Sequence, residues 1–263
     1  MSFIYVTPNL VDVDSLDSIS PPGEDAVYVK EHLYNNRPSK PFRFTSKAAQ
    51  YIRLHWDVDQ NITHISIFNH DLANGGAGTE YRIHAADAAV NLGAEYNQPL
   101  IWQGYSLYKH LDQTYKWWQI YINDPDHGTF PQIGELYFGQ WKEFPNGHVQ
   151  PDWSQNLKFS IAGEETYFGQ NWDYYLSDCK EFNIKIKNLN NPANIDDLET
   201  FFRSIGGSAG RFVFIPKENQ PYCYLVKIAN TDIVNNQIVR GFTGELNEWT
   251  MTLKTLVRGI KLL

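Results

Sequence analysis

The chain has 263 residues, of which 42% are hydrophobic and 15% aromatic, so it can fill two packed domains and is not a disordered chain. Its formal net charge is −8 and its 22 basic residues form no cluster, which excludes the electrostatic footprint of a nucleic-acid-binding protein. No apolar run has the length of a membrane span and no signal-peptide pattern opens the sequence, so we expect folding in the cytoplasm.

Residues 1–41 combine turn-forming Pro, Gly and Asn with scattered apolar side chains. We expect an irregular N-terminal arm that docks on a neighbouring part of the structure, because free solution would leave those apolar side chains exposed. The two cysteines, Cys179 and Cys223, lie far apart in the sequence. We interpret them as two buried free thiols.

Residues 42–142 carry several short stretches in which apolar and polar side chains alternate. In residues 49–57 the pattern places Ile52 and Leu54 on an inward face with Trp56, and it places Tyr51, Arg53 and His55 outward. Further strands are expected at 61–70 and 80–85, with a weak strand at 100–102 in a loop-rich segment. Many short strands without a helix predict an all-β sandwich or jelly roll.

The stretch 116–141 shows the strictest alternation. Trp118, Ile120 and Ile122 share one face of the predicted strand, and Gln119, Tyr121 and Asn123 share the other. Pro, Asp and Gly in residues 123–128 then end the strand, and a second short strand is expected at 133–138. We expect these two strands to form the closing pair of the sandwich, with their connecting loop exposed.

Residues 143–156 are polar and contain Pro and Gly, which is typical of a linker between domains. Residues 157–263 then predict a second β domain, with strands near 182–186, 212–215, 222–229, 237–242 and 248–257. One helix is expected at 195–205, with Asn194 as its N-cap and two glycines after its end. Its apolar stripe comprises Leu198, Phe201, Phe202 and Ile205.

No pattern in the sequence predicts catalysis, a cofactor or a metal site. The histidines near the first strands lack a converging ligand arrangement, and the glycines at 75–78 precede a strand instead of a phosphate-binding helix. Asp124, Asp126 and Glu135 could include the carboxylate pair of a glycosidase, and Asp124 and Asp126 could supply oxygens to calcium. Turn chemistry is the favoured interpretation. We therefore expect a protein that is not an enzyme.

Aromatic residues supply most of the candidate binding side chains. The candidates for contact with a glycan or a protein partner are Trp102, Tyr105, Tyr108, Tyr115, Trp117, Asp124, Asp126 and His127. For the aromatic members three roles stay open: packing in the sandwich, which we favour, a protein interface, or stacking on a sugar.

The first half of the chain resembles a known family in the segments AQYIRLHWD, ITHISIFNHDL, TEYRIHA, KWWQIYINDPD and QIGELYFGQW. These segments are similar to the discoidin or galactose-binding-like jelly roll found in tail proteins of long-tailed bacteriophages. The matching positions include the step Asn69 to Leu72 and the ending Ile133 to Gly139. In the second half, GRFVFIPKE, CYLVKIAN and GELNEWTMTLKTLVRG resemble the β domain of tail-tube and distal-tail proteins.

The resemblance implies a structural component of a phage tail tip or baseplate, made in the host cytoplasm and located in the virion tail. The C-terminal domain would join a ring of copies, commonly hexameric, and the jelly roll would contact neighbouring tail proteins or a host-surface glycan. The alternative is a carbohydrate-binding module whose main role is glycan recognition. A weaker alternative is a cell-wall hydrolase that uses Asp124 and Glu135.

Overall fold

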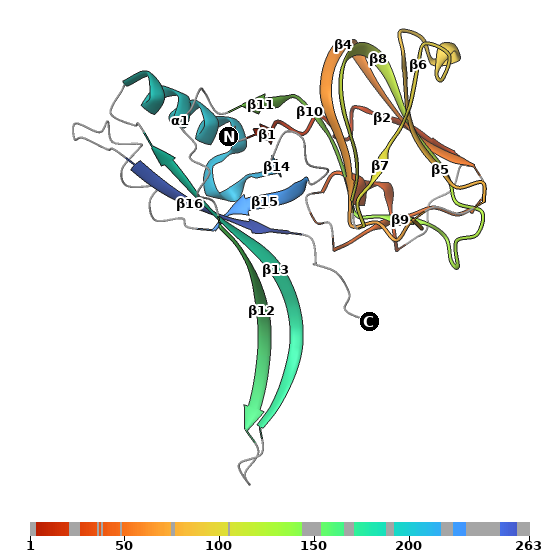
Figure 1. Ribbon diagram of the computed structural model, residues 1–263. Helices are drawn as coiled ribbons and strands as arrows, with labels where there is room; N and C mark the ends of the chain where they lie inside the picture. Colours follow the sequence, from red (N-terminus) through yellow and green to blue (C-terminus); the bar gives the residue numbers. More distant parts are fainter. Residues whose placement is uncertain are drawn as a thin grey trace. The chain divides into compact units, whose positions relative to one another are not determined.

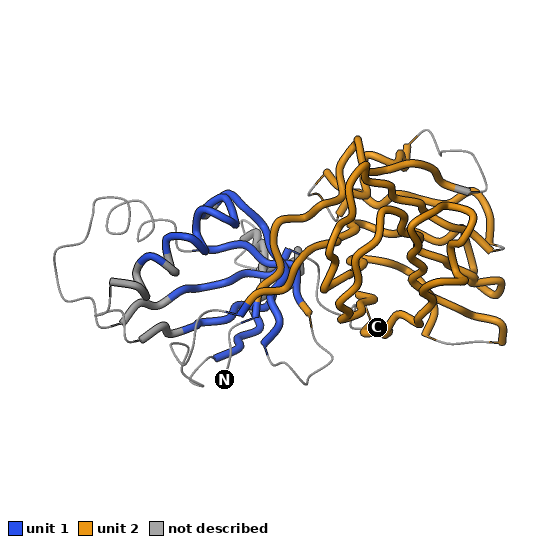
Figure 2. The backbone as a smooth tube through the Cα atoms, turned by 90° about the horizontal axis from the view of Figure 1, so that it is seen from above, with its two compact units in different colours: residues 1–4, 143–218, 224–263 blue, residues 5–142, 219–223 orange. Residues whose placement is uncertain are grey.

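A computed structural model describes residues 4–20, 27–35, 37, 39–47, 49–74, 77–104, 106–143, 154–165, 171–187, 192–216, 223–229 and 248–256. The chain divides into two compact units (Figure 2): unit 1 comprises residues 1–4, 143–218 and 224–263, and unit 2 comprises residues 5–142 and 219–223. The chain enters unit 2 within strand β1 (Ile4–Val6) and leaves it within β11 (Trp141–Glu143). The described residues are mainly β with one α-helix, which confirms the predicted fold class.

Unit 2 is built around one antiparallel sheet in the order β10-β4-β8-β5-β6, with β2 beside β4 and β7 beside β8 (Figure 1). A second, two-stranded sheet pairs β3 with β9. The strands are β2 (Leu16–Ser20), β3 (Phe42–Arg43), β4 (Gln50–Phe68), β5 (Glu80–Ala86), β6 (Tyr96–Pro99), β7 (Ile101–Trp102), β8 (Ser106–Asn123), β9 (Gln132–Ile133) and β10 (Glu135–Gly139), and the 3-10 helices are η1 (Lys30–Leu33) and η2 (Ala89–Asn91).

The core of unit 2 lies on one face of the main sheet. Most inward positions predicted from alternation on β4 and β8 are confirmed, because their Ile and Leu side chains and Trp118 are fully buried. Trp56 packs against this core but is only partly buried. Phe42 and Ile133, which face each other across β3 and β9, belong to the same cluster, as do side chains from η1 and the N-terminal segment. The unit is thus a β-sandwich whose second layer is small.

Two strands are longer than the sequence predicted. β4 is one strand of 19 residues where two were expected. Its pairing with β8 stops at His55 and resumes at Gln60 after a register shift, with a second shift between Ile62 and His64. β8 begins at Ser106, within the segment expected to be loop-rich. The expected closing pair was wrong: β10 pairs with β4, so β4 separates it from β8.

The N-terminal segment is regular where an irregular arm was expected. β2 pairs with β4 in the main sheet. Residues before it run along β10, where the Leu10 amide donates to the Phe138 carbonyl at 2.8 Å and the Asn9 side chain donates to the Leu136 carbonyl at 2.9 Å. Residues 5–41 thereby belong to unit 2.

Unit 1 contains a sheet in the order β14-β15-β16-β13-β12 with one helix. Its elements are β12 (Ser154–Glu165), β13 (Asn171–Lys187), α1 (Pro192–Ile205), η3 (Gly207–Ala209), β14 (Arg211–Ile215), β15 (Tyr224–Ile228) and β16 (Glu248–Thr255). Residues 144–153 of the predicted linker and the strand predicted at 237–242 lie outside the described residues.

The helix α1 packs on the sheet of unit 1 through its predicted stripe. Phe201, Phe202 and Ile205 are buried, and the Phe201 ring meets the Phe212 ring of β14 edge-on at 5.5 Å. The helix ends before Gly206, whose φ of +75° suits glycine. The N-cap prediction was wrong, because the helix begins at Pro192 and Asn194 lies inside its first turn.

The strands β12 and β13 form a hairpin that extends past the rest of the sheet of unit 1 (Figure 1). β13 pairs with β16 only from Glu181 to Lys187, whereas its pairing with β12 runs from Asn171 to Asn183. Within the described residues, no strand pairs with the outer edge of β12. In the described ranges, no strand pairs with the other edge of β13 before Glu181 either. A strand edge without a neighbouring strand can accept a strand from another chain.

Candidate functional site

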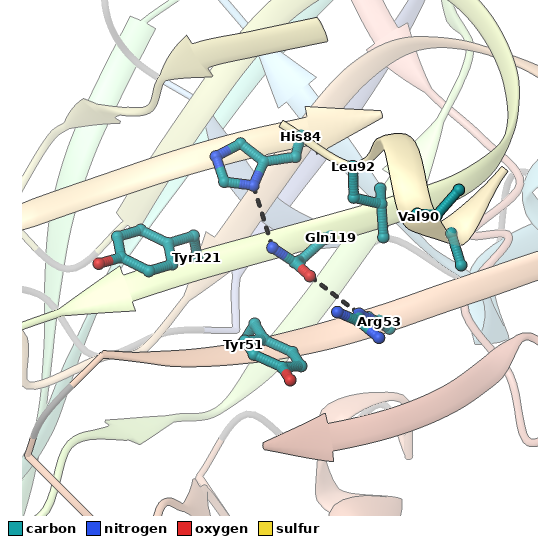
Figure 3. Close-up of a pocket in the computed structure, with 8 residues that line it drawn as sticks. Tyr51, Arg53, His84, Val90, Leu92, Gln119 and Tyr121 are labelled. Carbon is teal, nitrogen blue, oxygen red and sulfur yellow. Dashed lines mark hydrogen bonds between the residues drawn. The ribbon is translucent and has the colours of Figure 1, made fainter. Parts of the chain in front are cut away.

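The candidate site begins with a row of three polar side chains on the outer face of the main sheet of unit 2. Arg53 on β4 faces Gln119 on β8, and Gln119 faces His84 on β5. Arg53 Nε donates to Gln119 Oε1 at 2.9 Å, and Gln119 Nε2 lies 3.0 Å from His84 Nδ1 (Figure 3). Because Gln119 Oε1 accepts from arginine, its Nε2 must donate to His84, which places the histidine proton on Nε2.

Two tyrosines lie beside this row on the same face. Tyr51 on β4 faces Tyr121 on β8, and this pair lies two residues along the strands from the pair Arg53 and Gln119. The Tyr121 ring stacks with His84 at 5.8 Å between centroids and 21° between planes, and the Arg53 guanidinium lies 4.5 Å from the Tyr51 ring centroid. The polar row and the tyrosines thus hold one another in place.

The connection from β5 to β6 forms the opposite side of the site. Ala89, Val90 and Leu92 line it, and Val90 is 89% exposed (Figure 3). Gly93 follows with φ of +88°, and a Cβ there would lie 3.5 Å from His84 Nδ1. That distance is an ordinary van der Waals contact, so the positive φ is what favours glycine at this position.

We call the resulting depression the sheet-face pocket. Its volume is about 510 Å³, and it is lined by Tyr51, Arg53, His84, Ala89, Val90, Leu92, Gln119 and Tyr121. That volume suits a ligand of a few rings.

Arg53 is the one formal charge among the lining side chains, which include no carboxylate. Burial, and then the charge of Arg82, lower the pKa of His84, so its ring is neutral at neutral pH. The lining includes no serine, cysteine or carboxylate. The arrangement offers planar apolar surfaces around hydrogen-bonding groups, which is the chemistry of binding.

The predicted aromatic candidates lie elsewhere. Tyr108 is buried, and Tyr115 is half-buried with its ring edge-on to Trp118 at 6.0 Å. Trp102 is half-buried, and its indole Nε1 donates to the Leu72 carbonyl at 3.5 Å. Tyr105 lies outside the described residues. Trp102 and Tyr115 pack against the core of the sandwich, and the Trp117 ring stacks on His55 at 4.1 Å between centroids.

The acidic candidates organise loops. Asp124 is fully buried, and its Oδ2 lies 3.2 Å from the Ala73 amide and 3.1 Å from the Tyr81 hydroxyl. His127 places Nε2 at 2.8 Å from the Asp71 carbonyl oxygen and Nδ1 at 2.8 Å from that of Thr129.

Asp126 is exposed in the same turn, and Glu135, the other proposed hydrolytic carboxylate, is fully buried on β10. None of these side chains lines the sheet-face pocket.

Two further predictions concern thiols and metals. Cys223 is buried, but Cys179 is only partly so, which corrects the expectation of two buried thiols. Among the described residues, no three His, Cys, Asp or Glu side chains are arranged to hold a metal ion.

The helices in the described ranges include none with the length and apolarity needed to cross a membrane.

The residues of the sheet-face pocket were not singled out as a site from the sequence. Alternation did place Tyr51, Arg53, Gln119 and Tyr121 on outward faces of two strands. The missing information was the pairing of β4 with β8 and its register, which bring Arg53 opposite Gln119.

No protein-family model matches the chain, and no curated protein matches it. Among solved structures, it is similar to the CBM32-1 module of a family 31 glycoside hydrolase from Clostridium perfringens, at 10% identity and a TM-score of 0.36, over 49% of this chain and 98% of that one. It is also similar to the family 32 carbohydrate-binding module of C. perfringens NanJ in complex with galactose, at 15% identity and a TM-score of 0.37, over 48% and 93%. A chain from the structure of reduced XRCC1 bound to the DNA polymerase β catalytic domain matches at 12% identity and a TM-score of 0.35, over 51% and 99%.

Proposed function

We propose that the chain is a non-catalytic binding protein and that its unit 2 holds a carbohydrate in the sheet-face pocket. The observation that carries this proposal is the pair Tyr51 and Tyr121 beside the hydrogen-bonded row of Arg53, Gln119 and His84. The proposal rests on this pocket and not on the similarity to carbohydrate-binding modules.

A sugar ring matches these two parts of the pocket. Its C–H face is apolar and suits contact with a tyrosine ring, and its edge carries hydroxyl groups that need hydrogen-bond partners. Arg53 and Gln119 are held by each other, so little rotamer freedom is lost when a ligand binds. Leu92 and the exposed Val90 cover the other side of such a ring.

The test is calorimetry or array binding of the full chain with a panel of oligosaccharides. Tyr121→Ala removes the ring beside the polar row, and we expect at least about a tenfold loss of affinity, the scale of an interfacial tyrosine anchor. Phe130→Ala is the matched control, since Phe130 is an aromatic residue of unit 2 that is 44% exposed and does not line the pocket. The proposal fails if no glycan binds, or if both variants lose affinity equally.

A second candidate function is a structural role in a phage tail tip or baseplate, in a ring of copies of this chain located in the virion tail. The observation in its favour is the hairpin β12–β13, whose far edges have no neighbouring strand among the described residues and suit the addition of a strand from another chain. A two-stranded ribbon is marginally stable by itself, so a partner along its edges would stabilise it.

Shortening the hairpin tests this second function. Leu157 and Lys180 face each other, so residues 158–179 can be replaced by Asn-Gly, which closes a two-residue hairpin turn. We expect the wild-type chain to form rings visible by negative-stain electron microscopy, and the shortened chain to stay monomeric with unchanged glycan binding. A wild-type chain that is monomeric at high concentration and absent from virions contradicts the role.

A further inference from the structure

The sheet-face pocket is rich in hydrogen-bond donors and poor in acceptors. Arg53 is its one cation, and no carboxylate lines it. Gln119 Oε1 already accepts from Arg53, and His84 Nδ1 lies within hydrogen-bond distance of Gln119. A neutral sugar presents hydroxyl groups that both donate and accept, whereas an anionic group only accepts.

The Arg53 guanidinium is oriented and still has donors to offer. Its Nε donates a hydrogen bond to Gln119, and its Cζ atom lies 4.5 Å from the centroid of the Tyr51 ring. In the described part of the chain, neither Nη atom has a hydrogen-bond or ion-pair partner. A guanidinium with two parallel N–H groups binds the two oxygens of a carboxylate or a sulfate together.

We propose that the sheet-face pocket selects a negatively charged saccharide, with its carboxylate or sulfate on the Nη atoms of Arg53 and its ring against Tyr121. This inference rests on the proposed carbohydrate-binding function and adds the class of sugar. Arg82 lies opposite Tyr121, two residues before His84 on β5. It forms an ion pair with Glu80 at 3.9 Å and does not line the pocket. The specific contact therefore belongs to Arg53.

The experiment compares saccharides in matched pairs on an array, and the full chain is the probe. Each uronic acid oligosaccharide is printed beside its methyl ester, and each sulfated one beside its unsulfated parent. We expect the acidic member to bind about tenfold more tightly than its neutral partner, and raised salt to weaken that preference. The two kinds of pair distinguish a carboxylate from a sulfate.

Arg53→Gln and Arg82→Gln remove the same charge from the same face of the sheet. We expect Arg53→Gln to abolish the preference for the acidic member and Arg82→Gln to leave most of it, with thermal unfolding confirming that both variants fold. Arg53→Lys keeps the charge without the paired donors, so it should retain only part of the preference. Equal losses in both Gln variants overturn the assignment, because they indicate a general charge effect.

The remaining outcomes separate the two proposals. If neutral and acidic members bind equally and Tyr121→Ala abolishes both, the selection is wrong and carbohydrate binding stands. If no member of any pair binds, both proposals fall.

Discussion

Replacing Gly139 by alanine is expected to destabilise unit 2. Gly139 ends β10, and an added Cβ would lie 2.6 Å from the Pro8 carbonyl oxygen and 3.0 Å from Val6 Cγ1. A contact with backbone cannot be relieved by rotating a side chain. The residues that follow Pro8 are themselves held, because Asn9 and Leu10 hydrogen-bond to the β10 backbone. The N-terminal segment or the end of β10 must therefore move.

The magnitude follows from two opposing effects. Inserting a methyl group into a filled space costs about 1–3 kcal/mol. Replacing glycine by alanine also restricts the unfolded chain, which stabilises by about 0.4–1 kcal/mol. We therefore expect Gly139→Ala to lower the free energy of unfolding by about 1–2 kcal/mol. Gly128 is the matched control, since a Cβ there meets no atom within 4 Å.

The assay is urea unfolding of the full chain, combined with hydrogen exchange measured by mass spectrometry to follow unit 2 separately. Gly139→Ala should unfold at lower urea, and residues 5–10 should exchange faster. Gly128→Ala should match the wild type or slightly exceed it. A Gly139→Ala chain as stable as Gly128→Ala would refute the packing of the N-terminal segment on β10.

Three further predictions concern the loops and the pocket. Burial lowers the pKa of His127, but the carbonyl oxygens around it, including that of Asp71, outweigh this and raise the pKa above its usual value. The stabilising contribution of protonated His127 is then complete below a pH of about 6.5 and is lost as pH rises through the raised pKa. The difference in Tm between wild type and His127→Gln should therefore shrink from about pH 6 to pH 8. A constant difference would contradict this prediction. Gly93→Ala should cost about 1–2 kcal/mol in the free energy of unfolding, because a residue with a Cβ is strained at its positive φ, and it should weaken glycan binding because the β5–β6 connection must shift to relieve that strain; unchanged urea unfolding would count against this backbone conformation. Trp117 lies four residues before Tyr121 on the same face of β8, about 13 Å away along the strand. Trp117→Ala should therefore weaken the binding of long oligosaccharides, measured by calorimetry, more than the binding of monosaccharides. Equal losses would exclude a second sugar contact at Trp117.

The periodic parts of the fold could be predicted from the sequence because burial repeats with the backbone geometry. The alternation in β8 placed Trp118 and its apolar neighbours in the core, and the stripe of α1 placed Phe201 and Ile205 against the sheet. These positions depend only on local geometry.

Pairing between strands could not be predicted in the same way. The sequence predicted two strands where β4 is one, and alternation alone did not show that β4 pairs with β8 in the register that brings Arg53 opposite Gln119. The same limit applies to the aromatic candidates. Composition indicates that aromatic contacts exist, but only the sheet arrangement shows that Tyr108 is buried while Tyr51 and Tyr121 line a pocket.

The pocket floor consists of side chains from three adjacent pleated strands, not of the loops that join them. Loops tolerate inserted residues, whereas one extra residue inside β8 would turn Gln119 and Tyr121 toward the hydrophobic interior. Homologous proteins could therefore change the ligand that they bind through amino-acid substitutions that leave the length of the strands unchanged. Gain or loss of residues would be confined to the β5–β6 connection, where the rim can grow while the floor stays intact.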